Sequence, residues 1–320
     1  MEYRKLKGLT QEVSRLCIGG CPAGEYGWGD VRRSDIEAAI LQALELGVNF
    51  FDTADTYGLG RSEETFGNVL AGRRQRVVLA TKFGVRVENG KTFFDNSPRY
   101  IETALQASLR NLRTDYIDLY QAHYLDGVTP VPEMMEALIS LKRKGLIRAI
   151  GLSNVREEDA AAFLPYAGEI ASFQNHYSLA HRDDEQAILA IAGRLDAVPL
   201  TWGSLGQGVL TGKYGEDAFF GANDRRSRAV YDNFHGHKLA RNLRIVDAIR
   251  PMAEKYRAPV AGVAIRWILD RLPRGVVITG VKNRLQAEAN ARAFTFSLSR
   301  EEYGELDALS AGKPAVSQPL

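Results

Sequence analysis

The chain has 320 residues, of which 45% are apolar and 25% are charged, and this balance is typical of a soluble, well-packed globular protein. A formal net charge of +2 gives no reason to expect nucleic acid or an anionic membrane as a partner. No apolar run approaches the roughly 20 residues that cross a bilayer, and the polar start Met1–Lys5 leads into no apolar signal core, so we expect a cytoplasmic protein.

The two cysteines, Cys17 and Cys21, have a spacing that fits neither a zinc knuckle nor a redox motif. We therefore predict free thiols in a reducing compartment. No group of histidine, cysteine and carboxylate side chains has the spacing of metal ligands, so we predict no metal site.

The first part of the chain predicts a hairpin, a strand, a helix and a second strand. Extended runs on either side of Gly8 predict an N-terminal β-hairpin, and residues 13–18 lead into the first strand of the main sheet. Ser34 is the expected N-cap of a helix that runs to Leu46, because apolar residues repeat there at helical spacing. A buried strand is expected at 49–52, where the sequence then turns polar.

The same unit of strand and helix recurs along the rest of the chain. Eight near-continuous apolar strands that alternate with helices predict an α/β fold, namely a (β/α)8 TIM barrel with an N-terminal β-hairpin and extra helices, formed as one domain over residues 1–320. A doubly wound open sheet is the alternative, but no glycine-rich phosphate fingerprint follows the first strand. The later strands are expected at 76–82, 116–123, 147–153, 170–174, 198–202 and 276–278. The helices between the first five of these strands are expected at 98–112, 131–144, from about 156, and at 183–195, and an earlier helix is expected at 61–71.

A long insert at residues 203–257 interrupts the regular unit length. Its first part, through Arg228, is rich in Gly, Asp and Arg and predicts a loop, whereas 238–255 predicts an extra helix. Loops of this length in a compact domain are usually functional lids. The tail 311–320 contains Pro and Ser and is expected to be frayed.

Four chemically active residues fall at or just beyond the C-terminal ends of predicted strands: Asp52, Tyr57, Lys82 and His123. In a parallel barrel these ends form one rim, which is the catalytic face. Asp52 can hold Lys82 by an ion pair, and the ammonium group can lower the pKa of the Tyr57 phenol from its usual value of about 10. With His123 donating a hydrogen bond to a substrate oxygen, this set would protonate the alkoxide that forms as a carbonyl accepts hydride.

The segment Asp52–Gly58, followed by Ser62-Glu63-Glu64, resembles the first signature of the aldo-keto reductase superfamily. Lys82, His123 and the segment 150–154 match that family in order and spacing, and the resemblance covers nearly the whole chain. It implies Tyr57 as the general acid, Lys82 and Asp52 as the groups that tune it, and His123 as the group that orients the carbonyl. It also implies that NADPH lies across the rim without any Rossmann domain.

The resemblance further implies the cofactor contacts. Ser153 and Asn154 resemble the pair that holds the nicotinamide carboxamide, Gln174 resembles the third contact, and Trp202 resembles the aromatic residue that stacks on the nicotinamide ring. Read without the family, Ser153 and Asn154 could instead cap the next helix. Lys282 and Arg284 resemble the cations that grip the adenosine 2′-phosphate, which favours NADPH over NADH. The remaining implied cofactor residues are Gly20, Cys21, Gly203, Ser204, Leu205, Gly206, Gln207, Lys213, Arg225, Gly280, Gln286 and Asn290.

Five aromatic residues are candidates for the lining of a substrate pocket: Tyr26, Trp28, Phe93, Phe94 and Tyr124. Their faces and polar tips suit a hydroxylated ring and an aromatic carbonyl equally well. His176 and His181 fall outside the rim pattern, and we interpret them as structural or substrate-loop residues.

The leading hypothesis is an NADPH-dependent reductase of aldehydes or ketones, acting on a sugar-like, polyol-like or other small carbonyl compound. Two alternatives stay open: a regulatory NADPH-binding protein that resembles potassium-channel beta subunits, and an enzyme that uses its cofactor for internal redox, such as an epimerase. The expected partner is a small-molecule carbonyl substrate, and a homo-oligomer is left open.

Overall fold

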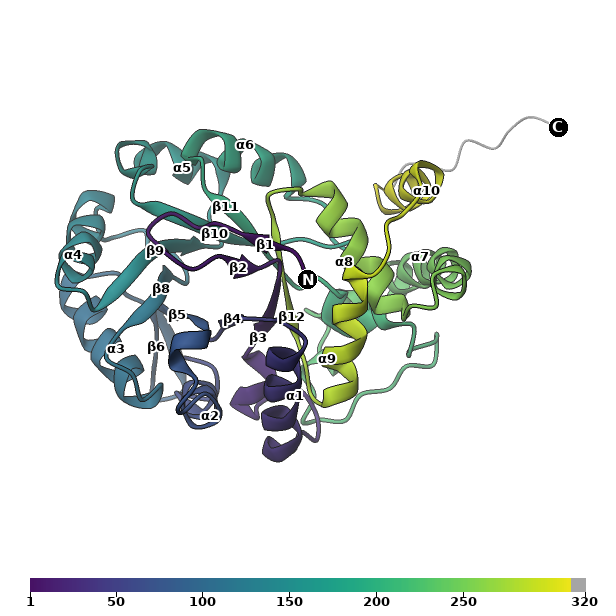
Figure 1. The fold of residues 1–320 in the computed structure, drawn as a ribbon, viewed down its shortest axis with the longest axis horizontal. Coiled ribbons are helices and arrows are strands. Elements are labelled where there is room, and N and C mark those ends of the chain that lie inside the picture. The colour runs from purple at the N-terminus through teal and green to yellow at the C-terminus, as the bar shows by residue number, and fades with distance from the viewer. Residues whose placement is uncertain (312–320) are drawn as a thin grey trace.

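Eight parallel strands close into a barrel at the centre of the molecule (Figure 1). The structure is a computed structural model, and it describes residues 1–311. The closed sheet has the order β10-β11-β12-β3-β4-β5-β8-β9, so each strand pairs with its sequence neighbours in the barrel and the last pairs with the first. This arrangement confirms the predicted barrel and excludes the open sheet. The strands are β3 (Leu16–Gly19), β4 (Phe50–Asp52), β5 (Val78–Phe83), β8 (Ile117–Ala122), β9 (Ile147–Ser153), β10 (Ile170–His176), β11 (Val198–Trp202) and β12 (Val276–Gly280).

Helices surround the barrel because each presents an apolar stripe to the strands. In α3, residues Ile101, Leu105 and Leu109 are buried at helical spacing. This helix begins as predicted, with Pro98 at its first position and the Ser97 hydroxyl accepting a hydrogen bond from the backbone of Tyr100. The surrounding helices are α1 (Arg33–Glu45), α2 (Arg61–Val69), α3 (Pro98–Asn111), α4 (Val131–Arg143), α5 (Glu157–Phe163), α6 (Glu185–Leu195), α8 (Val260–Arg271) and α9 (Arg284–Ala291).

The predicted start of α1 is wrong. Arg32 has extended backbone angles, and its carbonyl already accepts hydrogen bonds from the backbone N–H groups of Asp35 and Ile36. The helix therefore begins at Arg33, and Ser34 lies inside the first turn rather than at the N-cap. No side chain caps the start of this helix.

The N-terminal hairpin closes one end of the barrel, as Figure 1 shows. β1 (Tyr3–Arg4) pairs antiparallel with β2 (Val13–Ser14), and Leu6 and Leu9 from the connecting turn pack into the barrel interior. Interior side chains such as Cys17 and Phe50 fill the space above them. The N-terminal end is therefore sealed and packed, and the chemistry must take place at the opposite rim.

A second hairpin, absent from the sequence prediction, follows β5. β6 (Val85–Glu88) pairs antiparallel with β7 (Lys91–Phe94). Asn89 and Gly90 form the turn with φ values of 51° and 73°, the left-handed geometry that a two-residue hairpin needs. The Asn-Gly pair between extended residues is the sequence signal that would have predicted it.

The insert after β11 begins with the short 3-10 segment Gly206–Thr211 and ends in α7 (Gly236–Lys255), which starts two residues before the predicted helix. α7 packs against α10 (Arg300–Ser310) outside the ring of barrel helices (Figure 1). Over residues 1–311, no helix combines the length and the apolar character that crossing a membrane requires. The tail predicted to be frayed lies, from residue 312 onward, outside the described residues.

Candidate active site

The ends of two neighbouring strands supply a buried ion pair. Lys82 on β5 donates from Nζ to Asp52 Oδ2 on β4 at 2.6 Å and to the carbonyl of Thr53 at 2.8 Å. The side chains are 0% and 3% exposed. A buried pair of charges persists only when its remaining hydrogen-bonding capacity is also used. Here Asp52 Oδ1 accepts from the amides of Gln121 and Gln174, at 2.8 and 3.1 Å.

Gln121 is a site residue that sequence reasoning missed. It lies two positions before His123 on the same stretch of chain, so the alternation of a strand places both side chains toward the same face. This spacing is the signal that could have identified it.

Tyr57 and His123 complete the constellation. Lys82 Nζ lies 5.1 Å from the centroid of the Tyr57 ring, and the His123 ring lies 5.8 Å from the same centroid in an edge-on arrangement. The structure therefore brings Asp52, Tyr57, Lys82 and His123 together at one rim, with the predicted ion pair formed.

Two glycines fix the loop that carries Tyr57. A Cβ at Gly24 would lie 2.7 Å from the backbone of Tyr57, and a Cβ at Gly58 would lie 2.2 Å from the carbonyl oxygen of Gly24. Gly58 also has a φ of 62°. Only glycine at both positions lets the loop after β3 pack directly on the backbone beside Tyr57.

The predicted lowering of the Tyr57 pKa is wrong for this structure. Burial raises the pKa of the phenol well above its usual value, and the nearby Cys21 and Asp52 raise it further. The opposing charge comes from Arg225. Desolvation is the largest contribution to this shift, and it outweighs the opposing charge of Arg225. The phenol consequently keeps its proton at physiological pH and can serve as a proton donor.

His123 is held as a neutral ring. Burial lowers its pKa well below the usual value, and the charge of Lys82 acts in the same direction. A neutral imidazole carries one N–H donor and one acceptor nitrogen. Among the described residues, its buried Nδ1 has no hydrogen-bond partner. Nδ1 of His123 can therefore make a hydrogen bond with a molecule bound in the site.

Asn154 joins three strands at the place expected for the nicotinamide. Its side-chain nitrogen donates to the carbonyl of His123 at 3.0 Å, and its side-chain oxygen accepts from the indole N–H of Trp202 at 3.1 Å. The Ser153 hydroxyl donates to the carbonyl of Gln174. The capping alternative is wrong, because α5 begins at Glu157 with Arg156 as its N-cap.

Trp202 is stacked on a histidine that the sequence analysis left outside the site. The His176 ring lies 4.3 Å from Trp202 at an interplanar angle of 9°, and His181 stacks on the far side of His176 at 3.9 Å. Burial, followed by the charge of His181, lowers the pKa of His176 to about 3, so this ring is neutral at physiological pH. One face of the indole is therefore covered by a neutral imidazole.

The segment after β11 is a series of tight turns. Positive φ values occur at Gly203, Gly206, Gln207 and Gly208, and the amides of Gly206 and Gly208 donate to the carbonyls of Gly203 and Leu205 at 2.8 and 2.9 Å. The Ser204 hydroxyl is turned inward and donates to the carbonyl of Thr201 at 2.8 Å. Leu205 immediately precedes the 3-10 segment Gly206–Thr211, and Lys213 lies two residues after the end of that segment.

The two cations predicted to bind the 2′-phosphate, Lys282 after β12 and Arg284 at the start of α9, make contact with different neighbours. Lys282 Nζ contacts the carbonyl of Trp28, whereas the Arg284 guanidinium donates to Gln42 Oε1 on α1. The Gln286 side chain accepts from the backbone of Lys282 at 2.8 Å, and Asn290 donates to Thr279 at 3.0 Å. Gln286 and Asn290 thus fix the turn between β12 and α9 by hydrogen bonds within the chain. This turn follows Gly280, the exposed last residue of β12.

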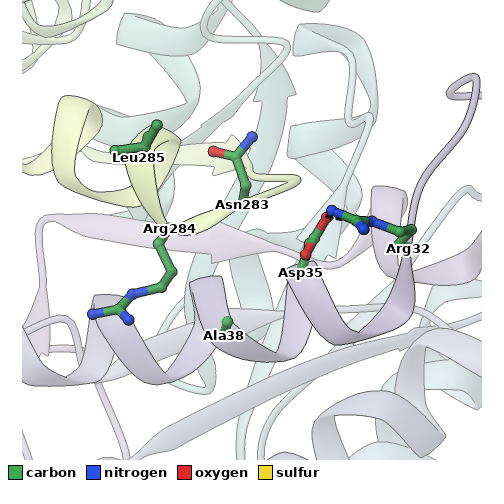
Figure 2. A pocket seen from close by; sticks show the side chains of 6 residues that line it. All are labelled: Arg32, Asp35, Ala38, Asn283, Arg284 and Leu285. Carbon is green, nitrogen blue, oxygen red and sulfur yellow. Dashed lines mark hydrogen bonds and ion pairs between the residues drawn. The ribbon is translucent and has the colours of Figure 1, made fainter.

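A hollow of about 310 Å³ lies between α1 and the first turn of α9 (Figure 2). Arg284 and Arg32 line it, together with Asp35, whose carboxylate is paired with Arg32 at 2.8 Å. Asn283 caps α9 by accepting from the backbone of Gln286. Arg32 is neutralised by Asp35, so the α9 N-terminus and Arg284, whose partner Gln42 is neutral, are the groups suited to a phosphate.

The predicted pocket aromatics form two groups. Phe94 from β7 lies 5.2 Å from Tyr124, and Tyr124 stacks on His123 at 5.1 Å, so aromatic rings lead from the second hairpin to the rim. Phe93, beside Phe94 on β7, is 47% exposed. The other group, Tyr26 and Trp28, lies against Arg225.

Gly20 and Cys21 follow β3 directly. A Cβ at Gly20 would lie 2.5 Å from Ser62 Oγ, so glycine is required there. The Cys21 thiol accepts a hydrogen bond from the Trp28 indole at 3.2 Å, and both cysteines are free thiols. Within residues 1–311, no three histidine, cysteine or carboxylate side chains are close enough to hold a metal ion.

The residues at this rim fit a nicotinamide dinucleotide. A glycine-rich segment follows β11, a helix N-terminus with cations follows β12, and Asn154 at the end of β9 holds the Trp202 indole. A TIM barrel with a Tyr, Lys, Asp and His set at its C-terminal rim defines a carbonyl oxidoreductase of the barrel type.

Comparison with known proteins identifies the family. Residues 15–311 match the profile of the Aldo/keto reductase family, and the protein belongs to this family. It is 32% identical to the aldo-keto reductase YhdN of Bacillus subtilis, over 100% of this chain and 96% of the relative. It is 31% identical to the NADH-specific methylglyoxal reductase of Escherichia coli, over 88% of each chain. The solved glycerol dehydrogenase AKR11B4 from Gluconobacter oxydans superposes with a TM-score of 0.87 at 33% identity, covering 99% of this chain and 97% of that structure.

Proposed function

We propose that the protein uses NADPH to reduce a small aldehyde or ketone, such as a sugar-like or polyol-like carbonyl compound, to an alcohol. The observation that carries this proposal is the buried Lys82–Asp52 pair beside a protonated Tyr57 and a neutral His123. The names of two relatives, a methylglyoxal reductase and a glycerol dehydrogenase, support small oxygenated substrates. The His123 imidazole favours catalysis over a purely regulatory role.

Each residue of the set has a defined task in the proposed reaction. A bound reduced dinucleotide would supply the hydride that adds to the carbonyl carbon. Tyr57 donates its phenolic proton to the carbonyl oxygen as negative charge develops there, and solvent later restores that proton. His123 donates a hydrogen bond to the same oxygen and orients it. Lys82, fixed by Asp52, stabilises the phenolate that Tyr57 becomes after the transfer.

Turnover distinguishes the proposal from its alternatives. Purified protein mixed with NADPH and a panel of short aldehydes, ketones and aldoses should oxidise the nucleotide, which can be followed by the loss of its near-ultraviolet absorbance. Tight NADPH binding without oxidation across the panel would favour the regulatory role. Nucleotide that co-purifies and stays bound throughout turnover would favour internal redox.

The preference for NADPH over NADH is expected to depend on Lys282 and Arg284. Replacing either by glutamine should weaken NADPH about 10- to 100-fold, the size of one charge-assisted hydrogen bond of about 1.5–3 kcal/mol, and leave NADH nearly unchanged. The measurement is equilibrium binding of both nucleotides to each variant. Since Arg284 lines the hollow beside the α9 N-terminus, its effect on NADPH should be the clearer one.

Arg292→Gln is the matched control for this experiment. Arg292 follows α9 and donates to the carbonyl of Arg257 at the exposed surface, so its loss removes one positive charge without altering the hollow. Equal losses for NADPH and NADH in the Lys282 and Arg284 variants would overturn the 2′-phosphate role. The comparison of NADPH with NADH matters for this chain because one relative is named an NADH-specific methylglyoxal reductase.

A further inference from the structure

Arg225 is a half-buried cation with only neutral partners. Its guanidinium donates to the carbonyl of Tyr26 at 3.1 Å and to the Tyr231 hydroxyl at 3.4 Å. Among residues 1–311, no carboxylate oxygen lies within 4.0 Å of it. The next residue, Arg226, is paired with Asp224 at 2.5 Å. One of two adjacent arginines is thus neutralised by the fold and the other is not.

The guanidinium of Arg225 is held in a fixed place. It lies 5.6 Å from the Tyr26 ring centroid and 5.5 Å from that of Trp28. A Cβ at Gly27, which has a φ of 73°, would lie 2.6 Å from Arg225 Nε, so the loop packs directly on the charged group. The backbone N–H of Arg225 also donates to the carbonyl of Gly27 at 3.1 Å. Such a constrained guanidinium loses little freedom on binding a further partner.

Arg225 lies beside the chain that follows β3: its guanidinium is 5.5 Å from the Trp28 ring centroid, and the Trp28 indole donates to the Cys21 thiol at 3.2 Å. Burial raises the pKa of the Tyr57 phenol, and the Arg225 charge opposes that rise. It opposes the burial-driven rise at the Cys21 thiol in the same way. Tyr231, which accepts from Arg225, adds to the rise that burial causes in the pKa of Tyr124. These pKa shifts agree with a position of Arg225 and Tyr231 on the same side of the barrel as Tyr57 and Tyr124.

A guanidinium group with free N–H donors is well suited to bind planar or tetrahedral oxyanions. Carboxylate and phosphate groups accept two parallel N–H bonds from a guanidinium, and such pairs are among the strongest hydrogen bonds in proteins. The other cation at the rim, Lys82, is already engaged by Asp52. An anionic group entering beside Tyr57 would therefore meet Arg225.

We propose that Arg225 binds an oxyanionic group of the substrate, so that the preferred substrates are short aldehydes or ketones that also carry a carboxylate or a phosphate. This inference rests on the proposed reductase function, and it assigns Arg225 to the substrate rather than to the cofactor belt that the sequence implied. During the reaction the anionic group stays bound while the carbonyl at the other end of the molecule is reduced and protonated by Tyr57.

Matched substrate pairs test this assignment. Succinic semialdehyde and butanal have the same chain length and differ by the carboxylate, and glyceraldehyde 3-phosphate and glyceraldehyde differ by the phosphate. The unaltered enzyme should favour the anionic member of at least one pair in kcat/KM by about 10- to 100-fold, as expected for one charge-assisted pair. Comparison of the two pairs shows whether the site takes a carboxylate or a phosphate.

Arg225→Gln should remove this preference, mainly through a higher KM for the anionic substrate. Arg225→Lys keeps the charge without the fork and should retain part of the preference. Arg228→Gln is the control, because Arg228 is an exposed arginine of the same loop and its loss changes the net charge equally.

A binding measurement without turnover separates substrate from cofactor roles. Succinate, which cannot be reduced, should quench the tryptophan fluorescence of the free enzyme through Trp28, and Arg225→Gln should abolish the quenching while Arg228→Gln keeps it. Equal kcat/KM for both members of each pair in the unaltered enzyme, or a loss confined to NADPH affinity in Arg225→Gln, would overturn the inference. Absence of any carbonyl reduction, even of butanal, would instead overturn the proposed function.

Discussion

Replacing Tyr57 by phenylalanine should lower carbonyl reduction by about 10²- to 10⁴-fold, the usual contribution of a positioned proton donor. The reason is that the phenol is the buried group at the rim that holds its proton at neutral pH, whereas burial keeps His123 neutral. The measurement is kcat for a reducible aldehyde at saturating nucleotide, with NADPH affinity determined in parallel.

The phenylalanine ring retains the contacts that position the loop. It keeps the edge-on packing against His123 and the glycine contacts on the backbone of Tyr57, so the midpoint of thermal unfolding and the Kd of NADPH should change little. Cys21→Ser is a useful control, because it changes a neighbouring side chain outside the proposed proton path. Full activity in Tyr57→Phe would show that another group donates the proton.

Replacing Lys82 by methionine should lower the free energy of unfolding by about 3–5 kcal/mol and abolish activity. It leaves the Asp52 carboxylate buried without its counter-ion, which is the costly way to break such a pair. The measurement is the denaturation midpoint in urea for the single variant, compared with the unaltered protein.

The double variant Asp52→Asn with Lys82→Met separates stability from chemistry. Removing both charges eliminates the unpaired buried ion, and the asparagine amide can still meet Gln121 and Gln174, so most of the lost stability should return. Activity should stay absent. The exposed pair Arg274–Asp196 is the control, since Arg274→Met should cost at most about 1 kcal/mol. A Lys82→Met protein as stable as the original would contradict the role of the pair.

The strand ends were predictable because their positions follow from order along the chain. Apolar runs at regular spacing predict parallel strands. Because the C-terminal ends of such strands meet at one rim of a barrel, the sequence alone placed Asp52, Lys82 and His123 together. The Lys82–Asp52 contact followed from their positions on neighbouring strands, β4 and β5.

Features that depend on three-dimensional surroundings were missed. The direction of the Tyr57 pKa shift is set by desolvation, which the sequence does not specify. His176 stacks on Trp202 because β10 runs two residues beyond its predicted end and the register sets the two residues side by side. The neutral surroundings of Arg225 depend on packing between the loops that carry Gly27 and Arg225.

The most direct test of the account follows the hydrogen that reaches the carbonyl carbon. The enzyme is incubated with an aldehyde and NADPH deuterated at the reactive C4 position, and the alcohol product is analysed by mass spectrometry and NMR. We predict one deuterium on the carbinol carbon with the unaltered protein, and at most trace labelled product with Tyr57→Phe over the same time. Alcohol formed without label, or labelled alcohol formed equally fast by Tyr57→Phe, would contradict the assignment of this rim as a site of hydride acceptance and Tyr57-dependent protonation.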